Sequence, residues 1–134
     1  MSTASADAPP GLSKPALHAL ADDVLLAVPG ALERGIEFVL AETRGHWHNR
    51  ARAMLCRRLK HVALSPQQSA RLVDCITRRL QTGAFTEQFR DQLRLARHLD
   101  PARTASAAVN CAASELTHVR RLAAWVLSPS RTEP

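Results

Sequence analysis

Residues 64–83 read LSPQQSARLVDCITRRLQTG, and they contain the start signal, the apolar stripe and the stop signal of a helix. Ser65 and Gln68 have the spacing of a capping box, and Pro66 occupies the first turn, where its missing N–H costs nothing. Gly83 is a typical residue to end a helix. The apolar positions between these signals recur on one helical face: Leu72, Val73, Ile76 and Leu80. The stretch therefore predicts an amphipathic helix with one face in a core.

The same punctuation recurs on both sides of this helix. Serine, threonine, aspartate, proline or glycine stands between amphipathic segments, and no segment alternates with the period of a strand. Short connections of this kind favour antiparallel neighbours. We therefore predict an all-α fold of about seven short antiparallel helices. They open at Ser13-Lys14-Pro15, after Pro29-Gly30 (running to about Thr43), at about His46 (to Val62), at Ser65, at Thr86, at Asp100-Pro101 and at Ser114-Glu115, and Pro129 ends the last.

The helical periodicity also predicts which side chains face the core. In the first helix the apolar stripe extends to Val28, and the third is centred on Trp47, Leu55 and Leu59. In the short alanine-rich helix the stripe predicts Ala105, Ala108, Val109 and Ala112 inside. In the last helix it predicts Leu116, Val119, Leu122, Ala123 and Val126.

Length and composition predict one domain. The chain has 134 residues, of which 46% are hydrophobic, which suits a single core. We expect a disordered leader over 1–12, one all-helical domain over 13–129 and a disordered tail over 130–134. No apolar stretch is long enough to span a membrane, and the first residues lack the features of a secretion signal. Three cysteines without paired spacing are typical of a reducing compartment, so we predict a cytoplasmic protein.

Charge is distributed unevenly along the chain. Residues 1–43 carry two basic and six acidic side chains, a net charge of −4, whereas residues 44–134 carry sixteen and six, a net charge of +10. A basic region of this kind can attract a nucleic acid or an acidic protein surface. The alternative interpretation is that arginine is simply the usual solvated surface residue of this protein, since only Lys14 and Lys60 are lysines.

The candidate binding residues are arginines grouped around two helices. Arg90, Arg94 and Arg97 follow helical spacing and form a stripe opposite the predicted core face. A second exposed pair, Arg71 and Arg78, lies on the helix after Ser65 and could extend a basic face. Acidic residues are interleaved with these arginines, and no aromatic residue lies among them on the two helices. Single-strand binders usually offer stacking rings, so this composition favours a protein partner.

Trp125 is the second candidate feature. It falls on the polar side of the last predicted helix, with Arg121 and His118 four and seven residues before it. Tryptophan beside arginine is the composition of an interface hot spot, although another segment could equally cover this ring. Arg58 likewise breaks the pattern of its helix, because it projects into the apolar stripe. It is expected to extend to solvent or to pair with a carboxylate of the acidic N-terminal half.

The segment Val119–Leu127, VRRLAAWVL, resembles the second helix of a HEAT repeat, in which Val-Arg is followed by a small residue and leucine. The helix opening at Pro101 stands where the first helix of that repeat would lie. The resemblance covers about a third of the chain and implies a protein-binding scaffold, or, for some members, a basic concave face for nucleic acid. A compact helical bundle accounts for the same helices, so the fold is either a HEAT-like stack of helical hairpins or such a bundle.

No set of residues predicts catalysis or a metal centre. His46 and His48 point to different sides of a helix, and Glu115 with His118 lacks the second pair that a di-iron site needs. His18 and Asp22 form a possible pair, but without a nucleophile. We therefore predict no enzyme activity and no cofactor, and a module that binds another protein as an adaptor, inhibitor or regulator. The alternative is a sequence-independent nucleic-acid-binding protein that uses the basic region 44–134.

Overall fold

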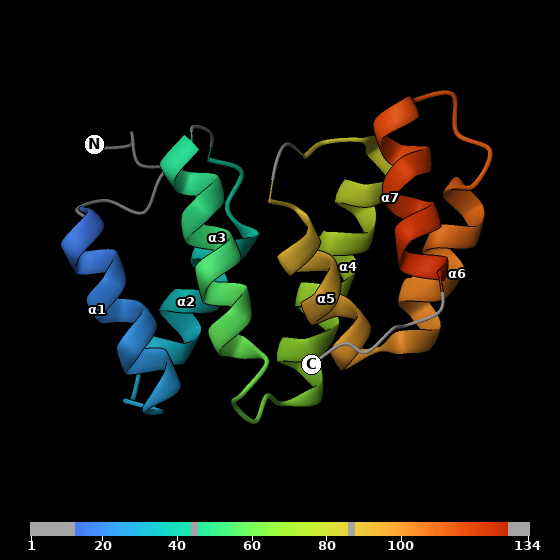
Figure 1. Ribbon diagram of the computed structural model, residues 1–134. Helices are drawn as coiled ribbons and strands as arrows, with labels where there is room; N and C mark the ends of the chain where they lie inside the picture. Colours follow the sequence, from blue (N-terminus) through green and yellow to red (C-terminus); the bar gives the residue numbers. More distant parts are fainter. Residues whose placement is uncertain (1–12, 44–45, 86–87, 129–134) are drawn as a thin grey trace, which may run out of the picture.

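The computed structural model describes residues 13–43, 46–85 and 88–128, and within these ranges the chain forms helices and no strands (Figure 1). The all-α prediction is confirmed. The predicted leader and tail, and the predicted cap Thr86, lie outside the described residues. The helices are α1 (Lys14–Leu25), α2 (Ala31–Leu40), α3 (His46–Leu59), α4 (Pro66–Thr82), α5 (Arg90–Leu99), α6 (Pro101–Cys111) and α7 (Thr117–Leu127).

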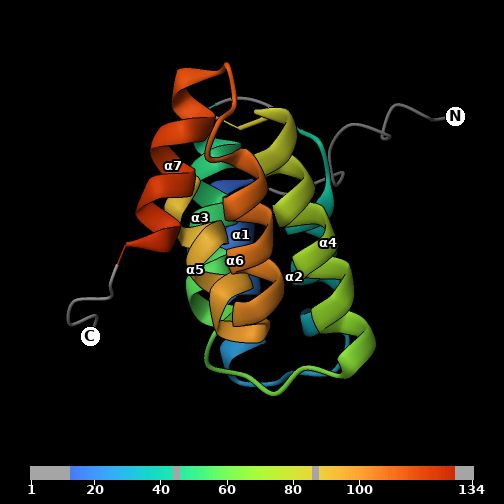
Figure 2. The same ribbon diagram turned by 90° about the vertical axis from the view of Figure 1, so that its right-hand side faces the viewer.

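The helices form two layers. Helices α1, α3, α5 and α7 lie in one layer and α2, α4 and α6 in the other, and successive helices run in opposite directions (Figures 1 and 2). Packing follows this order, because α1 contacts α2 and α3, α3 contacts α5, and α6 contacts α4, α5 and α7. The antiparallel neighbours are as predicted. A compact helical packing accounts for these contacts, and the HEAT-like repeat stays a prediction.

Helix α4 forms because its end signals work as the sequence predicts. Ser65 Oγ accepts a hydrogen bond from the Gln68 backbone N–H (3.0 Å), and Gln68 Oε1 accepts one from the Ser65 N–H (2.8 Å). Gly83 ends the helix with φ of 78°. Leu72, Ile76 and Leu80 of the apolar face between them are fully buried and belong to the same core as Leu55 and Leu59 of α3 and Leu93 of α5.

The boundaries of the first helices differ from prediction. Helix α1 ends at Leu25, because the chain turns through Ala27 at φ of 60°, and Val28 is 36% exposed rather than buried. Helix α2 ends at Leu40 instead of Thr43. Helix α3 ends at Leu59, with Val62 only packed against the edge of the core. For α1 and α3 the prediction extended the apolar stripe past the last turn that the core covers.

The buried face of α6 is rotated from the predicted one. Val109 is 59% exposed, Ala112 is exposed and Ala105 is half-buried. The residues that face the core are Thr104, Ala107, Ala108 and Cys111. Small side chains carry a weak periodic signal, so the spacing predicts that this helix exists but not which of its faces is buried. Helix α7 begins at Thr117, which leaves Leu116 as its N-cap and 45% exposed, while Leu122 is half-buried.

Candidate functional site

Trp125 is the centre of the strongest candidate site. The indole is half-buried on α7, and the guanidinium carbons of Arg90, Arg94 and Arg97 each lie 5.3 Å from its ring centre. Guanidinium groups at this distance are attracted by the ring quadrupole, by about 0.5–1 kcal/mol each at exposed sites. One tryptophan thus gathers three cations. We call Trp125 with these three arginines the Trp125 platform.

The platform depends on the layer that α5 and α7 share. The three arginines lie at i, i+4 and i+7 and therefore line one face of α5. Helix α7 comes to this face because it packs on α6 and α4, which also pack on α5 (Figures 1 and 2). The sequence indicated both halves of the platform but not that they meet. No aromatic residue lies among these arginines on α5 itself, as the sequence shows, but the fold brings the Trp125 ring to them from α7.

Only part of this positive charge is balanced. Asp91 pairs with Arg94 (3.0 Å) and reaches across to Arg57 on α3 (2.7 Å). No described carboxylate lies within ion-pair distance of Arg90 or Arg97. Both guanidinium groups lie over the indole instead. Such an arrangement leaves N–H donors free for carboxylate or phosphate oxygens.

The other predicted residues of α7 take different places. Arg121 is exposed one turn before Trp125 and so lies at the edge of the platform. The His118 ring lies 4.9 Å from that of Phe85, and its Nε2 is 3.1 Å from the Gly83 carbonyl oxygen. His118 therefore joins the beginning of α7 to the end of α4.

The additional basic pair, Arg71 and Arg78, does not join the platform. Both residues lie on α4, in the other layer of helices (Figure 1). Arg71 pairs with Glu33 of α2 at 2.8 Å, and this hydrogen bond lowers the pKa of the Glu33 carboxyl. The two arginine sets thus lie on helices of different layers, and Arg71 is engaged with α2.

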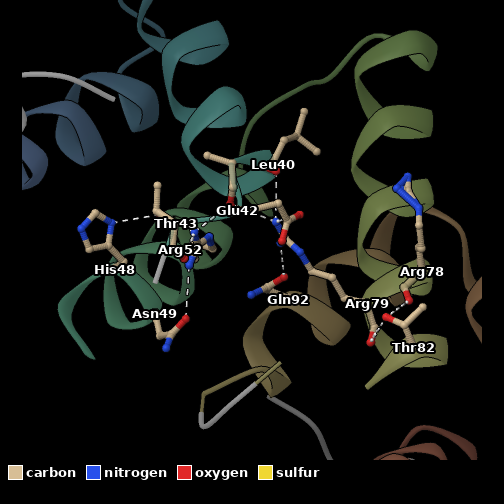
Figure 3. Close-up of polar contacts among 11 residues, drawn as sticks. Leu40, Glu42, Thr43, His48, Asn49, Arg52, Arg78, Arg79, Thr82 and Gln92 are labelled. Atoms are coloured by element: carbon tan, nitrogen blue, oxygen red, sulfur yellow. Dashed lines mark hydrogen bonds and ion pairs between the residues drawn. The ribbon is translucent and has the colours of Figure 1, made fainter. Parts of the chain in front are cut away.

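Two buried arginines form a polar cluster that the sequence analysis missed (Figure 3). Arg79 Nη2 donates to the carbonyl oxygens of Leu40 and Ala41, both at 3.1 Å, and to Glu42 at 3.0 Å, while Nη1 donates to Gln92 at 2.8 Å. The Arg79 side chain is only 7% exposed. Its guanidinium group therefore connects α4, α5 and the end of α2.

Arg52 of α3 approaches the same end of α2 from the opposite side. Its Nη2 donates to the Ala41 carbonyl (2.7 Å) and the Thr43 carbonyl (2.6 Å), and it also contacts Thr43 Oγ1. Burial, reinforced by the charge of Arg79, lowers the pKa of Arg52 to about 10, so the group remains charged at neutral pH. The last carbonyls of a helix lack intrahelical partners, and here guanidinium groups satisfy them. This explains why α2 ends before Thr43.

His48 extends this cluster. Its Nδ1 lies 2.9 Å from Thr43 Oγ1, the oxygen that also contacts Arg52. Because that oxygen accepts from Arg52, its own proton is available to an unprotonated Nδ1. Burial and the charge of Arg52 lower the pKa of His48 below its usual 6.5.

We expect stability to fall when the pH drops below about 6.5, because unfolded His48 takes up a proton more readily than folded His48. Nuclear magnetic resonance titration of the imidazole should give a midpoint below that of an unstructured histidine. Urea unfolding at pH 7.5 and 5.5 should then show a smaller loss of stability at the lower pH for His48→Gln than for the wild type. An equal loss in both proteins would contradict this role of His48.

The fold bears on two other kinds of chemistry, thiol catalysis and metal binding. The three cysteines are free and buried, and burial raises the pKa of each thiol, which disfavours the nucleophilic thiolate. Among the described residues, no three histidine, cysteine, aspartate or glutamate side chains are grouped to hold a metal. Within the same part of the chain, no helix is long and apolar enough to cross a membrane.

Arg58 pairs with a carboxylate of the acidic N-terminal half, one of the two outcomes expected from the sequence. Its Nη2 lies 3.9 Å from Asp22 Oδ1.

No family model matches this sequence. Comparison with curated proteins and with solved structures likewise found no match. A signal for the Trp125 platform was present in the sequence as two separate features, whereas nothing distinguished the buried Arg79 from the exposed Arg78 except its position relative to the apolar stripe.

Proposed function

We propose that this chain is a non-enzymatic interaction module that binds an acidic segment of another protein through the Trp125 platform and Arg121. The observation that supports the proposal is the convergence of three guanidinium groups on one half-buried indole, with Arg90 and Arg97 outside the described ion pairs. Tryptophan and arginine are the residues most enriched at binding hot spots.

The platform suits carboxylates for a physical reason. Stacking on the indole restricts the arginine side chains before binding, so less conformational entropy is lost when a partner arrives. Each guanidinium group presents a planar set of donors that matches a carboxylate with two parallel hydrogen bonds. The ring supplies apolar area for the rest of the partner segment. An acidic segment with an aromatic or aliphatic residue is the partner that this chemistry would recognise.

The test compares charge changes on the two layers. A fluorescein-labelled peptide of alternating glutamate and leucine serves as probe, with its glutamine counterpart as control, in fluorescence anisotropy at physiological salt. We expect the Arg90→Gln/Arg97→Gln variant to weaken peptide binding by about tenfold or more. The matched Arg71→Gln/Arg78→Gln variant removes the same charge from the other layer and should stay within about twofold. Equal losses in both variants would show that only net charge matters.

Trp125→Ala separates the ring from the charges. It retains all arginines but removes the surface that gathers them, so we expect about a tenfold loss of peptide affinity with an unchanged helical circular dichroism spectrum. Unchanged affinity would contradict the proposal.

A second candidate function is sequence-independent binding of nucleic acid, which the ring among the arginines also favours. Bases stack on aromatic side chains while arginines contact phosphates. Labelled single-stranded RNA and duplex DNA should be tested beside the peptide, at low and physiological salt. Nucleic-acid binding that is tighter than peptide binding at physiological salt, and that falls steeply with added salt, would replace the protein-binding proposal.

A further inference from the structure

A separate cavity lies between α1 and α3, outside the Trp125 platform. It has a volume of about 450 Å³ and is bounded on one side by Gln88, which precedes α5. Small-molecule sites commonly have volumes of about 300–1,000 Å³. The cavity therefore has the size of a ligand site, and its lining indicates which ligand chemistry fits.

The rim of the cavity is positively charged. Lys14 of α1 and Arg50 and Arg57 of α3 line it, and no carboxylate is among the lining residues. Arg57 is held in place by Asp91 at 2.7 Å. Lys14 and Arg50 are exposed, and neither takes part in an ion pair with a described carboxylate. A concave surface with one sign of charge concentrates ligands of the opposite sign.

The floor of the cavity is apolar. Leu17 and Ala51 are almost fully buried beneath it, and Met54 and Trp47 are half-buried beside them. Methionine adapts its shape to irregular ligands, and an indole offers a flat apolar surface. An apolar floor under a cationic rim matches a molecule with an apolar body and an anionic head.

The backbone of Gln88, which lines the cavity, is strained. It has φ of 70°, in the left-handed region that a side chain other than glycine, asparagine or aspartate rarely adopts. Holding a glutamine there costs about 1 kcal/mol relative to glycine. The strained residue lies against the cavity, with an amide that can donate to an anion. Strain of this kind is often found at ligand sites.

We propose that the cavity between α1 and α3 binds a small organic acid with an apolar or aromatic body. The anionic head contacts Arg50 and Lys14, and the body lies on Met54 and Trp47. The inference is independent of the Trp125 platform, since none of these residues belongs to it.

The probe for this site is 8-anilinonaphthalene-1-sulfonate, which has an aromatic body and one negative charge and fluoresces when it enters an apolar site. Three competitors separate head from body: octanoate has both, 1-octanol only the body and acetate only the head. We expect octanoate to displace the probe and the other two compounds to be ineffective at the same concentration. Equal displacement by octanol would overturn the requirement for an anion, and equal displacement by acetate the requirement for an apolar body.

Variants locate the binding. Arg50→Gln should weaken probe binding by about fivefold to tenfold, because one charge-assisted hydrogen bond is lost. Met54→Trp should fill the cavity and abolish the probe fluorescence that octanoate displaces from the wild type. Arg34→Gln removes the same charge from an exposed position on α2 and should leave binding unchanged. If Arg34→Gln weakens binding as much as Arg50→Gln, the probe reports overall charge and the proposed site is wrong.

Gln88→Gly should have two effects of opposite sign, one on stability and one on probe binding. Release of the left-handed strain should raise the midpoint of thermal unfolding, while loss of the amide weakens probe binding by about twofold to fivefold. A variant that is more stable and binds the probe more weakly supports a strained residue at a ligand site. Unchanged or tighter probe binding would show that Gln88 does not contact the ligand and would overturn its place in the site.

Discussion

Replacing Arg79 with leucine should lower the free energy of unfolding by about 3 kcal/mol, whereas Arg78→Leu should change it by less than about 0.5 kcal/mol. The two residues are adjacent on α4 and carry the same charge, but Arg78 is exposed and Arg79 is buried. Leucine cannot donate to the carbonyls at the end of α2 or to Gln92, which is only 6% exposed. Buried acceptors would lose their partner.

Two effects oppose this loss. Removal of a buried cation recovers its desolvation penalty, and it relieves the repulsion between Arg79 and Arg52. Arg52 also continues to donate to the Ala41 carbonyl. The loss should nevertheless dominate, because Arg79 donates to four acceptors, three at the end of α2 and one on α5. Hydrogen bonds from charged groups contribute about 1.5–3 kcal/mol each, so four of them together outweigh a desolvation penalty of several kcal/mol.

Urea unfolding followed by circular dichroism measures this difference, with Arg79→Lys as an intermediate case. Lysine retains the charge but not the planar fork of donors, so it should recover only part of the stability. If Arg79→Leu were as stable as Arg78→Leu, the hydrogen bonds of Arg79 would only offset the cost of burying its charge. They would then not stabilise the contact between α4, α5 and the end of α2.

Gly83→Val should also cost about 3 kcal/mol, because it adds two penalties at one position. Gly83 has φ of 78°, a conformation that a β-branched residue adopts only with strain. A Cβ atom there would lie 2.9 Å from Leu116 Cδ1 and 3.3 Å from Val119 Cγ2. Both contacts are with side chains at the start of α7. The exposed Leu116 can turn aside, but Val119 is fully buried and would have to shift within the core.

Gly30→Val is the matched control. Gly30 has φ of 83°, but its added Cβ meets only the flexible end of Arg34, at 3.3 Å. It should therefore show the conformational penalty alone, about 1–2 kcal/mol. Thermal unfolding of both variants separates the two effects, and equal losses would show that packing against α7 contributes nothing. In a Trp47→Phe background, Gly83→Val should also shift the emission of Trp125, because that ring is carried by α7.

The local signals of the sequence predicted the helices well and their ends less well. Ser65, Gln68 and Gly83 act within one turn of the chain, so their hydrogen bonds and φ angles follow from neighbouring residues. The error at α2 has a non-local cause, since its last carbonyls are satisfied by side chains from α3 and α4. The error at Val109 arises because alanine, serine and threonine define no clear apolar face.

The sequence by itself determined the all-helical class, the order of the helices and the arginine stripe of α5, since each depends on spacing along one segment. Only the tertiary structure decided that Trp125 lies among those arginines, that Arg79 is buried and Arg78 is not, and that three cations surround the cavity over Met54. The physical reason is that helical periodicity gives the direction of a side chain from its own axis. What that direction meets is determined by the packing of helices that lie far apart in the sequence.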